Sequence, residues 1–384
     1  MLKKPNHSKI LQNYYNSFRV IIRLIAKLDL VLYQSVIIEG MTFFSKITKK
    51  LNRAVGIDLG SAITRIWVEG KGLVLTEPSL LAVDVASQKV IAVGKQAALM
   101  RGRVAQGTEV LAPIQAPKIT DDILLKALLK SFLAKVNEQA YLFNPSVLVS
   151  ISSSFYPAMR QVLLEVLMDL GVREVMMINQ ALAAAIGAGV IVGDASGSFV
   201  FQLGAGAVEV AGLSLGKVVN QQHSMLAGNS IIQELIYWFA SKQNLKISEV
   251  LAENILRQAV SLQPHLLRSI NIPGLDTNTG EPAERRVIAS EMNPLITRYG
   301  QEYLSLVKKV LGGTSPDLTV DIIEKGLLLS GGLAQLDGLE EYMTQGLGVP
   351  AYMIDEPELA VIKGVGRALE QLDQIQLNPL YSLQ

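Results

Sequence analysis

One pattern occurs twice in this chain: an apolar strand, a glycine turn and a second strand. The first copy spans 55–64 (VGIDLGSAIT) and the second spans 199–208 (FVFQLGAGAV). A glycine turn between strands lets backbone N–H groups approach a phosphate closely. Two such turns, one in each half of the chain, predict two lobes that close on one nucleotide. The copies differ at the end of the first strand, which carries Asp58 in the first copy and Gln202 in the second.

Composition excludes several classes of protein and site. The 384 residues are enough for two or more domains with proper cores. A net charge of +1 gives no global reason to expect a nucleic-acid partner. The absence of cysteine excludes disulfides and thiolate metal sites. His7, His223 and His265 are too scattered to predict a metal site, so we interpret them as ordinary polar positions.

From Arg53 onward strands and helices alternate, which predicts an α/β fold. Asp121 and Thr120 are plausible caps for a first long helix, and residues 263–287 are rich in proline and glycine, which predicts loops. The predicted strands are 54–59, 65–69, 72–75, 81–85, 90–93, 146–152, 172–178, 199–203, 209–213 and 326–329. The predicted helices are 121–138, 159–170, 181–187, 231–242, 248–258, 291–311, 316–325, 337–345 and 359–371.

The first forty residues contain an apolar stretch at 18–38. It carries Arg19, Arg23, Lys27 and Asp29, whereas a membrane span needs about 20 mostly uncharged residues. It also lacks a small-residue cleavage site, which argues against a signal peptide. Two interpretations stay open: an amphipathic helix, or a stretch upstream of a true start at Met41. We expect the start at Met41.

A short basic amphipathic helix is predicted at 41–51. Its apolar residues recur at helical spacing on one face and its basic residues take the other: Phe43, Phe44, Ile47 and Leu51 against Lys46, Lys49, Lys50 and Arg53. Such a helix is suited to lie in a membrane interface, where lysine is attracted to anionic lipid. The alternative is a helix that docks on its own protein.

Further motifs follow the first turn at characteristic distances: Gly70-Lys71-Gly72, Thr76-Glu77-Pro78-Ser79, Val93-Gly94, Leu182-Ala183-Ala184-Ala185-Ile186-Gly187, Gly274-Leu275-Asp276, Thr279-Gly280, Pro316-Asp317-Leu318, Asp321-Ile322-Ile323-Glu324-Lys325-Gly326 and Leu329-Ser330-Gly331-Gly332. Together with 56–64, they resemble the actin-like ATPases, above all their bacterial shape-determining branch, the MreB family. The resemblance covers roughly residues 53–371, and the set is specific although each piece alone is weak.

The resemblance implies a two-lobed actin-like fold of four subdomains, with ATP and Mg²⁺ in the cleft and protomers joined head to tail. The implied divisions are an extension at 1–52, subdomain IA at 53–81, 115–194 and 364–375, subdomain IB at 82–114, subdomain IIA at 195–230 and 295–363, subdomain IIB at 231–294, and a tail at 376–384.

The resemblance also implies the site residues. Gln180 falls at the position that orients the attacking water, and Asp58 at the position that holds hydrated Mg²⁺. The implied nucleotide contacts are Asp58, Gly60, Ser61, Ala62, Ile63, Thr64, Gly204, Ala205, Gly206, Ala207, Glu253, Leu256, Gly331, Gly332 and Leu333.

Several of these positions depart from the family pattern. Gln202 replaces an aspartate, Ala205 a glycine, and Ala207 and Val208 two threonines in the second turn. Leu256 and Gln258 replace a lysine and a glutamate that contact the purine, and Leu333 replaces the last glycine of the third loop. The lost contacts, at about 0.5–1.5 kcal/mol per hydrogen bond, predict weakened or lost ATP binding and leave hydrolysis open. Asp58 and Gly60 could also persist because the hairpin needs its turn.

A second membrane element is implied by the resemblance. MreB proteins carry an apolar loop beside the N-terminal helix, and the matching segment is 141–145, with Leu142 and Phe143. We favour membrane insertion of these two residues. The alternative is a core anchor at the entry to a strand.

Three functions are weighed. The first is a membrane-associated, filament-forming cytoskeletal protein that organises cell-wall synthesis from the inner face of the cell membrane, with itself, an active MreB paralogue and the wall-synthesis machinery as partners. The second is a non-polymerising actin-fold adaptor of a division or pilus-assembly complex. The third is a sugar kinase, which ranks last because nothing resembles a sugar-binding base.

Overall fold

The computed structural model describes residues 53–371, except 105, 141–143 and 264–267. The chain divides into two units, 1–52 and 53–384, and the account below concerns the second. The predicted helix at 41–51 with Phe43, Phe44, Lys46, Ile47 and Lys50, the loop pair Leu142 and Phe143, and the tail at 376–384 lie outside the described residues. Among the described helices, none is both long and apolar enough to cross a membrane.

The first lobe is built on a five-stranded mixed sheet in the order β10-β9-β1-β2-β3. Its β1, β2 and β3 run antiparallel, whereas β1, β9 and β10 run parallel. β1 is buried along its whole length, which explains why its sequence is apolar apart from Asp58. The strands are β1 (Val55–Leu59), β2 (Ile63–Val68), β3 (Gly72–Pro78), β9 (Ser146–Ile151) and β10 (Glu174–Asn179).

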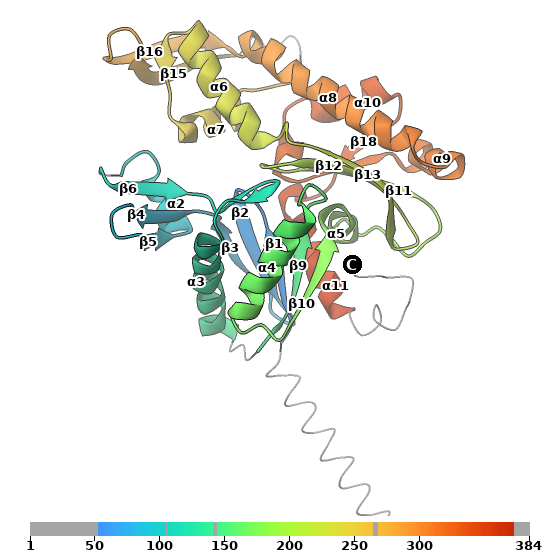
Figure 1. Cartoon of the computed structure of the whole chain (residues 1–384). Helices are drawn as coiled ribbons and strands as arrows, with labels where there is room; N and C mark the ends of the chain where they lie inside the picture. The colour runs from blue at the N-terminus through green and yellow to red at the C-terminus, as the bar shows by residue number, and fades with distance from the viewer. Residues whose placement is uncertain (1–52, 105, 141–143, 264–267, 372–384) are drawn as a thin grey trace, which may run out of the picture. The chain divides into compact units, whose positions relative to one another are not determined.

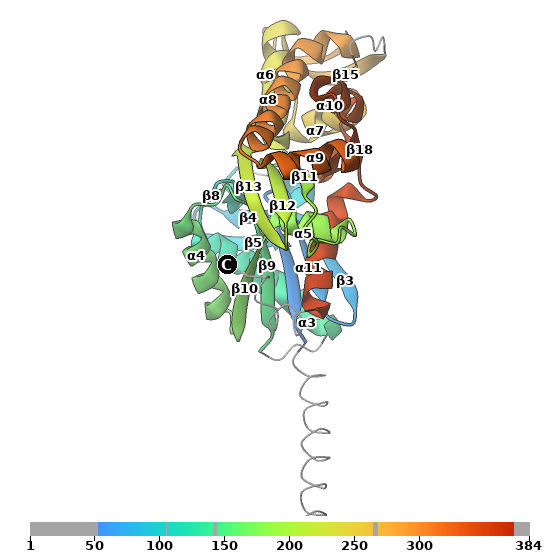
Figure 2. The same ribbon diagram turned by 90° about the vertical axis from the view of Figure 1, so that its right-hand side faces the viewer.

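Helices cover both faces of this sheet (Figures 1 and 2). On one face lie α3 (Asp122–Ala140) and α4 (Pro157–Asp169), and on the other lie α5 (Gln180–Gly187) and α11 (Ala360–Glu370). α3 begins at the predicted cap, because the Asp121 Oδ1 accepts a hydrogen bond of 2.8 Å from the Leu124 N–H.

A small antiparallel sheet in the order β5-β4-β6 adjoins the first lobe. It consists of β4 (Leu81–Asp84), β5 (Lys89–Val93) and β6 (Thr108–Leu111), with α2 (Lys95–Met100) against it, and a two-stranded pair follows, β7 (Ile114–Gln115) and β8 (Lys118–Ile119). This sheet lies within the range predicted for subdomain IB, apart from Leu81.

The second lobe repeats the topology of the first. Its sheet order is β13-β12-β11-β17-β18, again with three antiparallel strands followed by two parallel ones. The strands are β11 (Ser198–Leu203), β12 (Val208–Ser214), β13 (Lys217–Ser224), β17 (Leu327–Ser330) and β18 (Ala351–Met353). The repeat in the sequence is therefore a repeat of a whole sheet, and it confirms the two-lobed α/β prediction.

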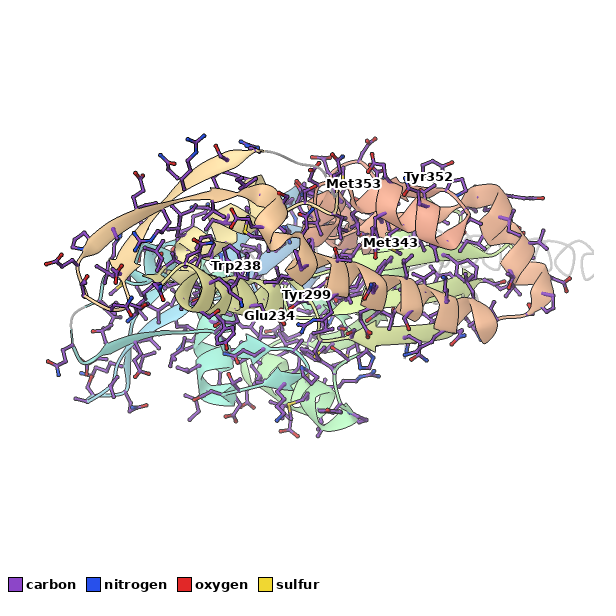
Figure 3. The ribbon with its side chains drawn as sticks, turned by 90° about the horizontal axis from the view of Figure 1, so that it is seen from above. Glu234, Trp238, Tyr299, Met343, Tyr352 and Met353 are labelled. Atoms are coloured by element: carbon purple, nitrogen blue, oxygen red, sulfur yellow. The ribbon has the colours of Figure 1, made fainter. Side chains whose placement is uncertain are left out.

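Five helices and a second small sheet complete this lobe. They are α6 (Gly228–Lys242), α7 (Glu249–Gln258), α8 (Asn293–Gly312), α9 (Pro316–Lys325) and α10 (Leu339–Leu347), with the sheet β14 (Leu245–Lys246), β15 (Ser269–Asp276) and β16 (Pro282–Ile288), and the 3₁₀ turns η1 (Ala289–Met292), η2 (Gly332–Gln335) and η3 (Pro357–Leu359). Figure 3 labels Glu234 and Trp238 on α6 beside Tyr299 on α8, where Arg298 ion-pairs with Glu234.

The two lobes share an apolar cluster centred on α5 and α11, which lie side by side in Figure 2. A Cβ at Gly187 would lie 1.8 Å from the Ala360 carbonyl oxygen, and one at Gly364 would lie 1.7 Å from the Ala183 carbonyl oxygen. These glycines let the backbones of the two helices touch. Val200 and Ala211 of the second sheet join the same cluster.

The prediction of loops for 263–287 was wrong, because β15 and β16 form a hairpin across most of this range. Ile272 and Val287 are the buried positions of the two strands. Each strand buries only one side chain, and Pro273, Gly274 and Pro282 interrupt the alternation of apolar residues, so the strand signal is weak. α2, β6, β13 and β18 were also missed; they are short or half-exposed.

Candidate functional site

Both predicted phosphate turns form, with the same hydrogen bond across each. The Gly60 N–H donates to the Ile63 carbonyl at 3.2 Å, and the Gly204 N–H donates to the Ala207 carbonyl at 3.1 Å. A Cβ at Gly60 would lie 2.6 Å from the Ile63 carbonyl oxygen, and one at Gly204 would lie 2.7 Å from that of Ala207. Closure of the turn itself therefore requires glycine at both positions, independently of any phosphate.

The two turns lie in contact with each other. A Cβ at Gly206 would lie 2.3 Å from the Ser61 Oγ and 3.2 Å from the Ala116 Cβ. The Ala116 N–H donates to the same Ser61 hydroxyl at 3.4 Å. In this conformation a phosphate could enter between the turns only if Ser61 and Gly206 moved apart.

The second turn is also joined to the start of α6. The N–H groups of Gly228 and Asn229 donate to the carbonyls of Gly204 and Ala205, at 3.2 and 2.7 Å. Free N–H groups at a helix N-terminus are natural anion ligands. Here these two have acceptors within the protein.

Hydrogen bonds from buried hydroxyl groups stabilise the first turn. The Thr64 and Ser79 side-chain oxygens are 2.8 Å apart and both residues are fully buried. The Ser79 Oγ also donates to the Gly60 carbonyl at 2.7 Å, and its N–H donates to the Ala62 carbonyl at 2.9 Å. The Thr64 hydroxyl thus maintains the turn rather than facing a ligand.

Asp58 is buried at the end of β1 and is fully engaged. It lies directly opposite Arg65 on β2 and Ser150 on β9. Its Oδ1 accepts a 2.9 Å hydrogen bond from the Ser150 Oγ, and its Oδ2 lies 3.5 Å from the Arg65 Nη1. Burial raises the pKa of Asp58, although the Arg65 charge and hydrogen bonds from Ser150 and Gln180 act in the opposite direction.

Gln180, the residue predicted to position the attacking water, lies next to Asp58. It is the first residue of α5, whose N-cap is Asn179. The Asn179 Oδ1 accepts hydrogen bonds from the N–H groups of Ala181 and Leu182, at 2.9 and 3.2 Å. This cap orients the helix start and so fixes Gln180 beside the carboxylate.

On the second lobe Gln202 has a partner within the protein. Its Oε1 accepts a 2.6 Å hydrogen bond from the Ser330 Oγ at the end of β17. A neutral amide in this bond offers no charge to a cation.

Sequence reasoning missed Glu209, a buried carboxylate opposite Gln202 on β12. Its Oε2 accepts hydrogen bonds from the Ser152 Oγ, the Ser153 N–H and the Ser153 Oγ, at 3.0, 2.6 and 2.7 Å. Its Oε1 is buried without a hydrogen-bond partner. Glu209 thus links the second lobe to the chain that follows β9 in the first. The sequence signal for this residue was a single carboxylate, Glu209, within a largely apolar strand.

The other predicted nucleotide contacts are divided between the core and the surface. Leu256 and Leu333 are buried in the apolar core of the second lobe, and Gly331 fits closely against the Leu203 carbonyl. Glu253 stays partly exposed on α7 and forms an ion pair of 2.9 Å with Arg257. The structure thus gives Leu256 and Leu333 a packing role.

An ion pair links the first lobe's small sheet to α7. The Arg101 Nη1, just after α2, lies 3.7 Å from the Glu249 Oε1 and 3.9 Å from the Glu253 Oε2. A predicted nucleotide contact, Glu253, therefore also bridges the two lobes.

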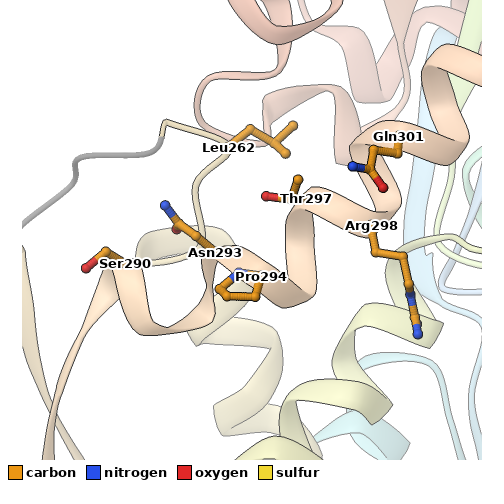
Figure 4. A pocket seen from close by; sticks show the side chains of 7 residues that line it. All are labelled: Leu262, Ser290, Asn293, Pro294, Thr297, Arg298 and Gln301. Atoms are coloured by element: carbon orange, nitrogen blue, oxygen red, sulfur yellow. The ribbon is translucent and has the colours of Figure 1, made fainter.

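A hollow of about 380 Å³ lies along α8 and not between the turns (Figure 4). Ser290, Asn293, Pro294, Thr297, Arg298 and Gln301 line it together with Leu262. None of these residues is a predicted nucleotide contact, so this hollow is separate from the candidate site.

The residues present do not fit a magnesium site. Within the described residues, no three His, Asp or Glu side chains are grouped closely enough to hold a metal ion. Asp58 already has Ser150 and Arg65 as partners, and Gln202 is neutral. The two glycine turns could still present backbone N–H groups to phosphates if they separated.

A family model described as MreB/Mbl protein matches residues 52–377. The chain is 31% identical over 324 residues to the cell shape-determining protein Mbl of Bacillus subtilis, covering 84% of this chain and 97% of the relative. It is 32% identical over 325 residues to the cell shape-determining protein MreB of Escherichia coli, covering 83% and 94%.

Solved structures agree with the fold. MreB5 of Spiroplasma citri bound to ADP superposes with a TM-score of 0.81 at 26% identity, covering 86% of this chain and 99% of that one. The MamK double helical filament has a TM-score of 0.69 at 15% identity, which supports the actin-like fold.

Proposed function

Because this chain belongs to the MreB/Mbl family of actin-like, cell shape-determining proteins, we propose that it is a membrane-associated scaffold that forms filaments and binds nucleotide weakly. The observation that carries the proposal is the similarity to cell shape-determining proteins over more than four fifths of the chain. The organisation of cell-wall synthesis at the inner face of the cell membrane is part of the same proposal, with an active MreB paralogue as a further filament partner.

One set of observations favours nucleotide binding and another argues against tight binding, and together they support weak binding. MreB5 has been solved with ADP and with AMPPNP, and this chain keeps both glycine turns in the same fold. Yet the turns touch, Asp58 is paired with Arg65, and Gln202 is held by Ser330. Calorimetric titration of the full chain with ADP tests this part. Dissociation constants below about a micromolar would contradict weak binding.

Self-association is supported by exposed apolar side chains at one end of the second lobe. Val320 and Ile323 on α9 are 51% and 59% exposed, and Tyr352 and Met353 on β18 are 50% and 40% exposed. Gly326, which caps the C-terminus of α9, packs against the Tyr352 ring. β18 pairs with β17 and is the last strand of its sheet. An exposed apolar patch beside a sheet edge favours contact with another chain.

The decisive experiment is sedimentation with negative-stain microscopy of the full chain. We expect filaments that pellet, and we expect Ile323→Glu to reduce pelleting at least about tenfold because it places a charge in the contact. Met168→Glu, on an exposed apolar residue of α4, is the matched control. A wild-type chain that stays monomeric at all concentrations would favour the non-polymerising adaptor instead.

Membrane association rests on the sequence of 41–51 and on Leu142 and Phe143. We expect Phe43→Ser with Phe44→Ser to reduce co-sedimentation with anionic liposomes, and Leu142→Ser with Phe143→Ser to reduce it further. Leu99→Ser, on an exposed apolar residue of α2, controls for the loss of an exposed apolar side chain elsewhere in the chain. Unchanged co-sedimentation of both double variants would contradict membrane insertion.

A further inference from the structure

We propose that Arg65 is a built-in counter-ion that takes the place of a divalent cation beside Asp58, so that the cleft neither needs nor admits a metal ion. The proposal deepens the nucleotide site proposed above. It depends on neither filament formation nor membrane binding.

The pairing follows from the sheet register. β1 and β2 pair antiparallel without a break from Val55↔Val68 to Leu59↔Thr64, which puts Asp58 directly opposite Arg65. Directly opposed residues in such a ladder have their Cβ atoms about 5 Å apart. The Gly60 turn fixes this register, so the guanidinium cannot leave the carboxylate's neighbourhood unless its side chain changes rotamer.

Burial keeps the pair together. The Arg65 side chain is 13% exposed and that of Asp58 is 8% exposed. Arginine stays protonated in proteins, so its positive charge is permanent. A divalent ion at Asp58 would come to lie beside this charge in a poorly hydrated site, where repulsion is weakly screened.

The candidate ligands for a divalent cation are already engaged by other protein groups or are uncharged. Magnesium is usually bound through one or two free carboxylates and several waters. The Asp58 carboxylate is already neutralised by Arg65. Its neighbour Gln180 carries no charge, and neither does Gln202 on the second lobe. Glu209 lies opposite Gln202 on the neighbouring strand. Its Oε2 accepts three hydrogen bonds but its Oε1 has no partner, so Glu209 is included in the test.

The experiment is an Mn²⁺ titration of the full chain followed by electron paramagnetic resonance, with and without ADP. For the wild type we expect no bound Mn²⁺ that depends on Asp58 or Glu209. Arg65→Met should gain one Mn²⁺ per chain, roughly a hundredfold tighter than any wild-type binding, because the carboxylate becomes free. Adding Asp58→Asn to Arg65→Met should remove that ion, and Arg65→Lys, which keeps the charge, should not gain it.

Two results would overturn the proposal. One is a stoichiometric wild-type Mn²⁺ site that is lost on Asp58→Asn or Glu209→Gln. The other is an Arg65→Met variant that keeps the wild-type circular dichroism spectrum and melting curve but gains no ion. If Arg65→Met does not fold, the Mn²⁺ titrations of the wild type, Asp58→Asn and Glu209→Gln alone test the proposal. Sedimentation of the same samples reports polymerisation separately, so failure of the scaffold function would be recognised as such.

Discussion

Substitution of Gly364 by alanine should destabilise the body of the protein at the junction of its lobes. Its new Cβ would lie 1.7 Å from the Ala183 carbonyl oxygen and 2.6 Å from the Ala183 carbonyl carbon. Ordinary contacts of a Cβ begin near 3.4 Å, and the obstacle is backbone, so α5 and α11 must separate. Overpacking typically costs about 1–3 kcal/mol, and backbone-to-backbone obstruction places this case at about 3 kcal/mol or above.

The assay is urea and thermal unfolding monitored by circular dichroism. At about 2.1 cal/mol/K of unfolding entropy per residue, a loss of about 3 kcal/mol corresponds to a fall in melting temperature of roughly 4–5 °C for a body of about 320 residues. Gly312→Ala is the matched control, because Gly312 ends α8 with no atom within 4 Å of its new Cβ. In a helix, alanine is favoured over glycine by about 1 kcal/mol, so the control should be neutral or stabilising. A Gly364→Ala variant that melts with the wild type would refute the close-contact reasoning.

Three further predictions concern single polar groups. Glu209→Gln should lower the free energy of unfolding by about 1–3 kcal/mol in urea titrations, because an amide cannot accept all the hydrogen bonds of a buried carboxylate at once. Ser79→Ala should cost a similar amount, about 1–3 kcal/mol, since it leaves the Thr64 hydroxyl and a turn carbonyl without their partner; an unchanged urea midpoint would contradict this role. Backbone hydrogen bonds, foremost from the Asn278 N–H, lower the pKa of Asp276 below 3.8, so its contribution to stability is present above pH 3.8 and lost as the pH falls through the lowered folded-state pKa. Asp276→Asn should therefore melt at a temperature that depends less on pH in this acid range, and an identical pH profile would refute the assignment.

Much of the lobe architecture could be predicted from the sequence, because the spacing of apolar residues indicates where the strands and helices lie. The strands predicted on either side of each glycine turn overlap β1, β2, β11 and β12, and the helix predicted at 316–325 has the bounds of α9. The hairpin of β15 and β16 could not be found in this way, because its strands bury few side chains and contain proline and glycine.

The site was less predictable, since its chemistry depends on which strands become neighbours. Asp58 faces Ser150 because β1 pairs with β9, a contact between segments far apart in the sequence. Arg65 could have been found earlier, because a two-stranded hairpin with a known turn sets the cross-strand partner of Asp58. The resemblance to a family suggested a ligand role for Leu256, whereas its burial in the second lobe's core gives it a packing role.

The contact between Ser61 and Gly206 has a consequence for affinity measurements. If the touching form of the turns is the dominant state, a ligand binds only the fraction of molecules in which they have parted, and its apparent dissociation constant rises by the inverse of that fraction. With about one molecule in a hundred parted, a site of micromolar intrinsic affinity would titrate as a site of about 0.1 mM. A partner subunit that held the turns apart would remove this hundredfold difference in apparent affinity.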